Sequence, residues 1–220
     1  PNAAEIRIVT DRAAYTLPAA LLDIDGISAQ AGSDAKPEDI TIEIRIHETP
    51  AAKAAQVQAA AEREGGRAVV QPVDFEIIAS YGSKTVQVNR FSNYVERMIA
   101  LPEGTDPSDI TTGVVLTEDG ELFHVPTIVI RQDGVAYAVM NSLTNSTYSV
   151  IYHPREMADV AGHWARANVN DMASRLIVEG VSETEFRPDA AITRAEFAAI
   201  VTRGLGIRPA HYAGAFPDVR

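Results

Sequence analysis

The sequence predicts an α+β chain in two parts, a β-rich module over residues 1–152 and a helical repeat over residues 153–209. Hydrophobic residues alternate with polar ones up to about residue 152, as in strands with one buried face, and recur at helical spacing from Met157 onward. The charge divides at the same place. Residues 1–152 contain 11 basic and 21 acidic residues, whereas residues 153–209 contain 7 and 8. The first part is therefore the acidic one.

The clearest strand covers residues 40–46, where isoleucine occupies every second position and polar residues lie between. Turn signals at residues 81–83, 119–120 and 133–134 separate other candidates, and the last two suit hairpins. Together they predict a meander. The remaining predicted strands span residues 5–9, 69–80, 85–88, 95–101, 113–116, 125–131, 136–141 and 148–152.

One segment of the first part has a helical composition instead. Residues 50–64 are rich in alanine, glutamine and charge, and they end at Gly65-Gly66, which can supply a left-handed helix cap. We therefore expect a sandwich-like module with one crossing helix.

The second part carries two helical apolar stripes separated by a breaker. Gly180 and Pro188 prevent one continuous helix and predict a helix-loop-helix arrangement. Trp164, the only tryptophan, lies on the first stripe, which favours a position in the core. The linker over residues 152–157 is short, so we expect the two parts to pack together. The stripes consist of Trp164, Met172 and Leu176, and of Phe197, Ile200, Val201 and Leu205.

Composition argues against several classes of function. The formal charge of −11 disfavours a nucleic-acid partner, and the absence of cysteine rules out disulfides and thiolate metal sites. Five scattered histidines without ligand spacing predict no metal site. We found no nucleotide-binding or nucleophile motif, so we expect no cofactor, no catalytic residue and no enzyme activity. No apolar run approaches the roughly 20 residues of a membrane span.

Three segments of the second part occur in the order of a known repeat. Residues 159–165 (DVAGHWA), 186–189 (FRPD) and 192–197 (ITRAEF) resemble the opening, middle and signature of the S-layer homology family. Residues 216–219 (FPDV) are similar to a second opening, 59 residues after the first, so residues 210–220 are expected to begin another repeat. We expect the chain to be a fragment of a secreted Gram-positive surface protein located in the cell wall or S-layer.

The resemblance implies a helix-loop-helix repeat, usually present in threes, that packs against neighbouring repeats and binds a secondary cell-wall polysaccharide. That polymer is commonly pyruvylated, and a guanidinium can hold the carboxylate of a pyruvate ketal by two charge-assisted hydrogen bonds. Arg194 therefore takes the leading role. Stripes left exposed on an isolated repeat would favour a homo-oligomer.

The resemblance also places Asp159, Trp164 and Gly180 where the family lines or supports its sugar groove. Asp159 could equally be a cap or turn residue. Thr193 and Glu196 fit a helix capping box, which explains both by structure alone.

The sequence departs from the family at two places. Glu183-Thr184-Glu185 precedes Phe186 where an Asp-Gly pair is common, and Leu176 stands where glycine is frequent. Whether this repeat binds glycan itself or braces its neighbours is therefore left open.

The β module is similar to β-rich stretches that precede such repeats, which implies a spacer. Two alternatives remain. A glycan-binding or adhesive module would show an exposed aromatic platform on one sheet, and a wall-acting enzyme would show a concave pocket with two facing carboxylates.

Overall fold

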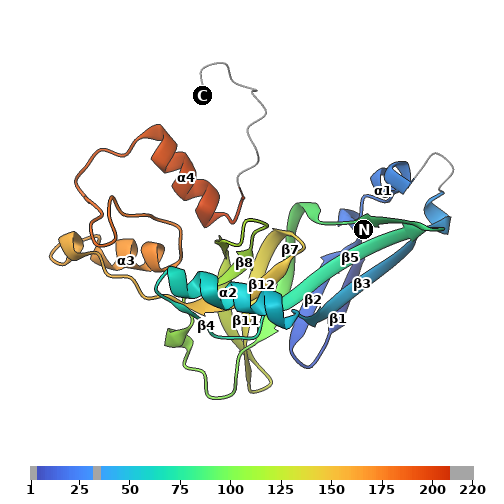
Figure 1. Cartoon of the computed structure of the whole chain (residues 1–220), viewed down its shortest axis with the longest axis horizontal. Coiled ribbons are helices and arrows are strands. Elements are labelled where there is room, and N and C mark those ends of the chain that lie inside the picture. The colour runs from blue at the N-terminus through green and yellow to red at the C-terminus, as the bar shows by residue number, and fades with distance from the viewer. Residues whose placement is uncertain (1–3, 32–35, 209–220) are drawn as a thin grey trace.

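A computed structural model describes residues 4–31 and 36–208, and its first part is a sandwich of two antiparallel sheets (Figure 1). The first sheet has the strand order β1 (Glu5–Val9), β2 (Ala13–Pro18), β7 (Arg90–Ala100), β11 (Val135–Thr144) and β10 (Thr127–Gln132). The second has the order β3 (Thr41–Glu48), β5 (Val73–Tyr81), β12 (Thr147–Tyr152), β8 (Thr112–Leu116) and β9 (Leu122–Val125). β4 (Arg67–Ala68) pairs with β12, and β6 (Lys84–Gln87) pairs with β5.

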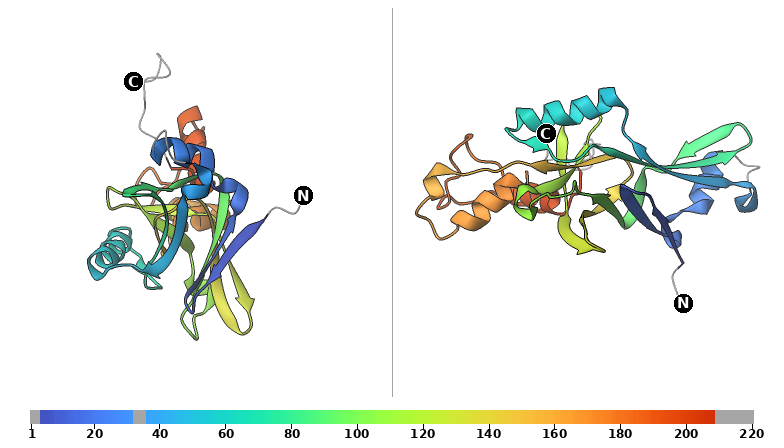
Figure 2. Two further views of the ribbon diagram at one scale, coloured as in Figure 1. Left: turned by 90° about the vertical axis from the view of Figure 1, so that its right-hand side faces the viewer. Right: turned by 90° about the horizontal axis from the view of Figure 1, so that it is seen from below.

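The main core lies between the two sheets, which face each other in Figure 2. Tyr15 of the first sheet packs against Phe75 of the second with ring centroids 5.5 Å apart, and Phe75 meets Tyr148 edge-on at 5.8 Å. Because side chains alternate between the faces of a strand, every second residue of β5 and β12 points into this layer. The predicted sandwich is confirmed.

The predicted turns are present, but the meander is wrong. Gly82, Gly120 and Gly134 have positive φ and connect β5 to β6, β8 to β9, and β10 to β11. However, β2 pairs with β7 and β12 pairs with both β5 and β8, so neighbouring strands come from distant segments. The predicted strand 125–131 is divided at Pro126, which cannot donate a ladder hydrogen bond, and there the chain passes from the second sheet to the first.

The crossing helix is α2 (Ala51–Arg63), as the sequence predicts. It ends in a Schellman motif at Gly65, whose φ is 81°, with the Gly66 amide donating to the Ala61 carbonyl. Ala61 packs on Val114 and Ile151, so α2 covers the outer face of the second sheet. A second helix, α1 (Ile24–Ala31), was not predicted from the sequence. Short 3-10 helices are η1 (Ala19–Leu21), η2 (Pro37–Asp39), η3 (Pro107–Asp109) and η4 (Ala158–Val160).

The second part contains α3 (Arg166–Ser174) and α4 (Arg194–Gly204), joined by a loop as expected. Its small core consists of Met157, Val160, Val169 and Ala173. The prediction that Trp164 packs in a core is wrong, since this side chain is 86% exposed. Trp164 lies in the turn before α3, so the helical period does not set its direction.

The two parts of the chain pack together, as the short linker predicts. The His153 ring nitrogen Nδ1 donates to the Ser174 carbonyl at 2.6 Å, and the Arg155 amide donates to Ser174 Oγ at 2.8 Å. At the far end of α4, the Tyr94 hydroxyl donates to the Leu205 carbonyl at 2.6 Å. None of the helices in residues 4–31 and 36–208 is long and apolar enough to cross a membrane.

Candidate functional site

The start of α4 presents one arginine on a well-fixed backbone. Thr193 Oγ1 accepts a hydrogen bond from the Glu196 amide at 3.1 Å, and the Glu196 carboxylate accepts one from the Thr193 amide at 2.8 Å. The bond from the Thr193 backbone is also the main cause that lowers the pKa of Glu196. This confirms the capping box predicted for Thr193 and Glu196.

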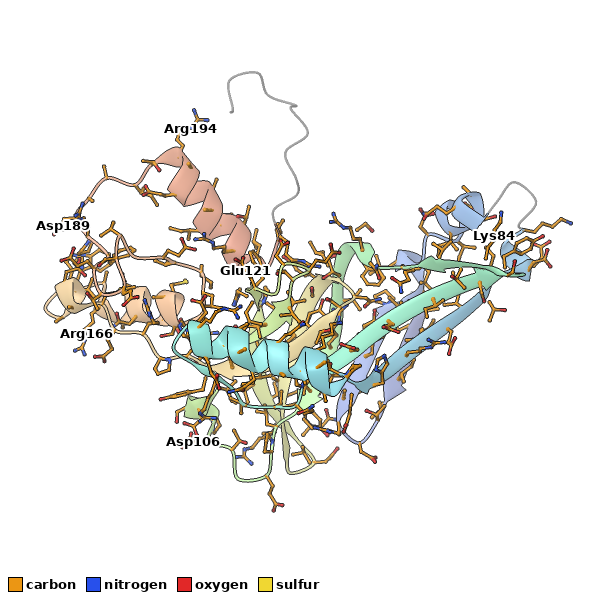
Figure 3. All side chains as sticks on the ribbon, in the orientation of Figure 1. Lys84, Asp106, Glu121, Arg166, Asp189 and Arg194 are labelled. Carbon is orange, nitrogen blue, oxygen red and sulfur yellow. The ribbon has the colours of Figure 1, made fainter. Side chains whose placement is uncertain are left out.

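Arg194 occupies the first position of the helix, directly after the cap. Its side chain is exposed and projects away from the body of the chain (Figure 3). Within the described part of the chain, no hydrogen bond or ion pair engages its guanidinium. The group retains all its donors for an external carboxylate, and the amino end of a helix adds a favourable field for an anion.

Asp159 has a different position from the one expected of a sugar ligand. Its carboxylate accepts hydrogen bonds from the Phe186 amide at 3.0 Å and the Arg187 amide at 2.6 Å. These two bonds, with that from Phe186 as the larger cause, lower the pKa of Asp159 from its ordinary value of 3.8. Asp159 thus clamps the loop of residues 180–187, which favours the structural alternative for this residue.

We expect Asp159→Ala to open this loop. The amides of Phe186 and Arg187 would lose their acceptor, so a glutamate-specific protease should cut faster after Glu183 or Glu185. Because the folded pKa is lowered, the clamp is complete above pH 3.8 and is lost as the pH falls through the folded value.

Asp171→Ala is the matched control for this proteolysis, since Asp171 forms its ion pair with Arg175 along the surface of α3 and not with the loop. In Asp171→Ala, the loop of residues 180–187 should be cut at the wild-type rate. Equal rates for wild type and Asp159→Ala would show that the clamp does not hold the loop.

Gly180 is required by the same loop. A Cβ at this position would lie 2.4 Å from the Ser182 carbonyl oxygen and 2.5 Å from that of Glu185, so any side chain would collide with backbone. Asp159 and Gly180 therefore both shape one loop. In the described residues, no hydrogen bond, ion pair or ring contact links Arg194 or Trp164 to this loop, and the ring near Trp164 is His163, at 5.4 Å.

Leu176, which stands at the end of α3 where the family often has glycine, adopts the left-handed backbone conformation that favours glycine. Its φ is 62°, its amide donates to the Ala173 carbonyl, and the Ile177 amide donates to the Met172 carbonyl. This is a complete Schellman motif, like the one at the end of α4, where Gly206 has a φ of 63°. The substitution therefore leaves the helix ending intact.

A cleft of about 1230 Å³ between the second sheet and the repeat was not foreseen, because its walls come from distant segments. Among the predicted ligand residues only Gly180 lines it. It contains several carboxylates, as the enzyme alternative requires, but three of them face cations or histidine. Lys53 Nζ lies 3.7 Å from Asp74, Arg203 Nη2 lies 2.7 Å from Glu179, and His47 Nε2 lies 3.6 Å from Glu76.

An aromatic platform, the feature required of an adhesive β module, is missing from the described part of residues 1–152. Every aromatic side chain there is buried or half-buried. The strongly exposed aromatic rings of the described residues, Trp164 and Phe197, both belong to the second part.

Comparison with known proteins confirms the resemblance. The family model of the S-layer homology domain matches residues 156–198, inside the predicted repeat 153–209. The start of a second repeat predicted at residues 210–220 lies outside the described residues. No solved structure matches the chain.

Among similar curated proteins are an amylopullulanase of Thermoanaerobacterium thermosulfurigenes, an S-layer-related protein of Niallia circulans and a cellulosome-anchoring protein of Acetivibrio thermocellus. They are 36%, 39% and 34% identical over 36%, 30% and 23% of this chain. The matches span only 4%, 4% and 11% of those proteins, so activities that reside elsewhere in them do not transfer through the match.

Proposed function

Because residues 156–198 form an S-layer homology domain, we propose that this chain attaches a surface protein non-covalently to an anionic, pyruvylated cell-wall polysaccharide. A cell-surface location follows from the domain itself. The names of two relatives, an S-layer-related protein and a cellulosome-anchoring protein, agree with an anchoring role.

The observation that carries the proposal is the free guanidinium of Arg194 on the capped start of α4. A pyruvate ketal offers one carboxylate, and a planar guanidinium can meet its two oxygens with two parallel hydrogen bonds. The chain is acidic overall, with a formal charge of −11, so long-range attraction of an anionic polymer is absent. Binding then depends on such local contacts.

Neighbouring repeats are the second proposed partner. The outer face of α4 leaves Phe197 60% exposed and Val201 41% exposed, and Ile192 just before the helix is 56% exposed. An apolar face of this kind supports packing against another repeat or a second copy of the chain.

The β module is proposed to be a spacer without catalytic function. The described aromatic side chains of the module are all buried or half-buried, and the ammonium of Lys53 lies beside its buried cleft carboxylate Asp74. This arrangement favours a role as a rigid spacer that carries the repeat over a role as an adhesive or enzymatic surface.

We expect Arg194→Ala to weaken binding of the chain to purified pyruvylated wall polysaccharide by roughly tenfold to a hundredfold in a co-sedimentation assay. Loss of hydrogen bonds to a charged group is worth about 1.5–3 kcal/mol, which corresponds to that range. The overall fold should be unchanged, because the Arg194 side chain has no partner among the described residues.

Two controls separate ligand contact from structure. Arg166 is the first residue of α3, as Arg194 is of α4, so Arg166→Ala removes an exposed charge at the same helix position, although Arg166 lies 3.5 Å from Glu156 (Figure 3). Thr193→Ala should cost about 1 kcal/mol of stability through the lost cap but spare binding. If Arg194→Ala binds like Arg166→Ala, this repeat has a structural role and Arg194 is not a ligand contact.

A further inference from the structure

Three side chains with metal-binding atoms meet on the second sheet, away from the anchoring residues. His47 of β3 lies opposite Asp74 of β5, and Glu76 follows two positions later on the same face of β5. Figure 1 shows these two strands running side by side. One ligand atom from each of the three residues lies within 4.8 Å of the other two.

The His47 ring is oriented as a metal-ligating histidine requires. Its Nδ1 lies 3.2 Å from the Glu48 carbonyl oxygen, which can only accept, so Nδ1 is the donor in this contact and the neutral ring has its lone pair on Nε2. Nε2 in turn lies 3.6 Å from the Glu76 carboxylate. Histidines that bind metals commonly donate their second N–H to a backbone carbonyl in this way.

Asp74 is a buried carboxylate with one oxygen unused. The residue is 5% exposed, and the hydroxyls of Thr49 and Thr147 both donate to Oδ1. Lys53 Nζ lies 3.7 Å from the same atom. Within residues 4–31 and 36–208, Oδ2 accepts no hydrogen bond, which leaves this oxygen free to bind a cation beside His47 and Glu76.

We propose that His47, Asp74 and Glu76 bind one zinc ion. One imidazole nitrogen with two carboxylate oxygens is a zinc donor set, whereas calcium and magnesium prefer oxygen alone. Three protein ligands leave the fourth tetrahedral position to water. Asp74 and Glu76 line the large cleft, so that open position can face it. The site is independent of the wall-anchoring role.

Sequence spacing could not reveal this site. His47 lies 27 residues before Asp74, and only the register of β3 against β5 brings them together. Lys53, from the first turns of α2, places its ammonium beside Asp74 and competes with the metal. This competition gives the proposal a specific test.

Zinc binding to the metal-free chain, measured by competition with a chromophoric chelator, should saturate at one ion per chain. His47→Ala and Glu76→Gln should each weaken binding by more than the roughly 10–100-fold typical of an outer-shell change. Lys53→Met should bind zinc more tightly than wild type. Cobalt should give the intense visible absorption of a tetrahedral site in the wild type and lose it in His47→Ala.

His163→Ala is the matched control, because His163 Nε2 also faces one carboxylate, Asp189, at 3.4 Å, but without a third ligand in the described chain. The His163→Ala variant should bind zinc with the affinity of the wild type. Unfolding curves without metal verify that each variant folds. Absence of a one-to-one complex in the wild type, or equal affinity in His47→Ala, would overturn the site, and unchanged affinity in Lys53→Met would remove Asp74 as a ligand.

Discussion

Arg97→Ala is expected to lower the free energy of unfolding by roughly 3–5 kcal/mol, as large-to-small substitutions in a core do. Arg97 is completely buried between the sheets, at 0% exposure, and no carboxylate pairs with it among the described residues. Its guanidinium instead donates to the Val95 carbonyl at 2.8 Å, to Asn145 Oδ1 at 2.9 Å and to the Thr144 carbonyl.

Three aromatic rings complete the surroundings of this cation. The guanidinium carbon lies 4.7 Å from the ring centre of Tyr148, 5.2 Å from that of Tyr15 and 5.7 Å from that of Phe75. Each ring can contribute up to about 2 kcal/mol to a desolvated cation. Truncation removes these contacts, leaves a cavity and deprives several buried carbonyl oxygens of their donor, so the losses act together.

Urea unfolding followed by far-ultraviolet circular dichroism would measure this effect. Fluorescence is a poor probe, because Trp164 is already exposed in the folded chain. Arg131→Ala, at the exposed end of β10, is the control and should change stability by no more than about 0.5 kcal/mol. A stable Arg97→Ala would mean that desolvation of the charge cancels its contacts.

The second large effect is a loss of stability in mild acid through His124. Burial, together with the smaller effect of the nearby Arg175 charge, lowers the pKa of this histidine from 6.5 to about 4. The ring lies 3% exposed on β9, with Nδ1 2.8 Å from Thr112 Oγ1. It also hydrogen-bonds the backbone of Arg175 at the end of α3. Protonation would therefore disturb the junction of the two parts.

The sign follows from the two protonation states. The unfolded chain takes up a proton on this residue near pH 6.5, whereas the folded chain does so only near pH 4. The contribution of His124 is complete above pH 6.5 and decreases as the pH falls toward 4. Between pH 7 and pH 5 it should remove about 2 kcal/mol.

Denaturant unfolding at pH 7 and pH 5 would test this dependence. His124→Gln removes the titrating group, so its unfolding free energy should change less between the two pH values than that of the wild type. His163 is a half-buried histidine of the repeat, and His163→Gln should retain the full dependence. An identical pH dependence in wild type and His124→Gln would show that His124 is not responsible.

The parts of the molecule that sequence alone determined are those set by neighbouring residues. The alternating isoleucines of β3, the turns at Gly82, Gly120 and Gly134, and the left-handed end of α2 are local features. The Thr193 capping box is closed over four residues, and the family motifs are likewise contiguous. Periodicity and steric restriction of φ act within a few residues, so these features can be predicted without knowledge of the tertiary structure.

Only the tertiary structure decided which strands pair, how Asp159 is used and where Trp164 lies. The order of the sheets depends on pairings between residues as far apart as Ala13 and Ile99, and Asp159 meets amides 27 and 28 residues later. Only the tertiary structure likewise decided the surroundings of the buried Arg97 and brought His47, Asp74 and Glu76 together. The energy of a buried charge and the donor set of a metal depend on neighbours in space, and strand register and packing determine those neighbours.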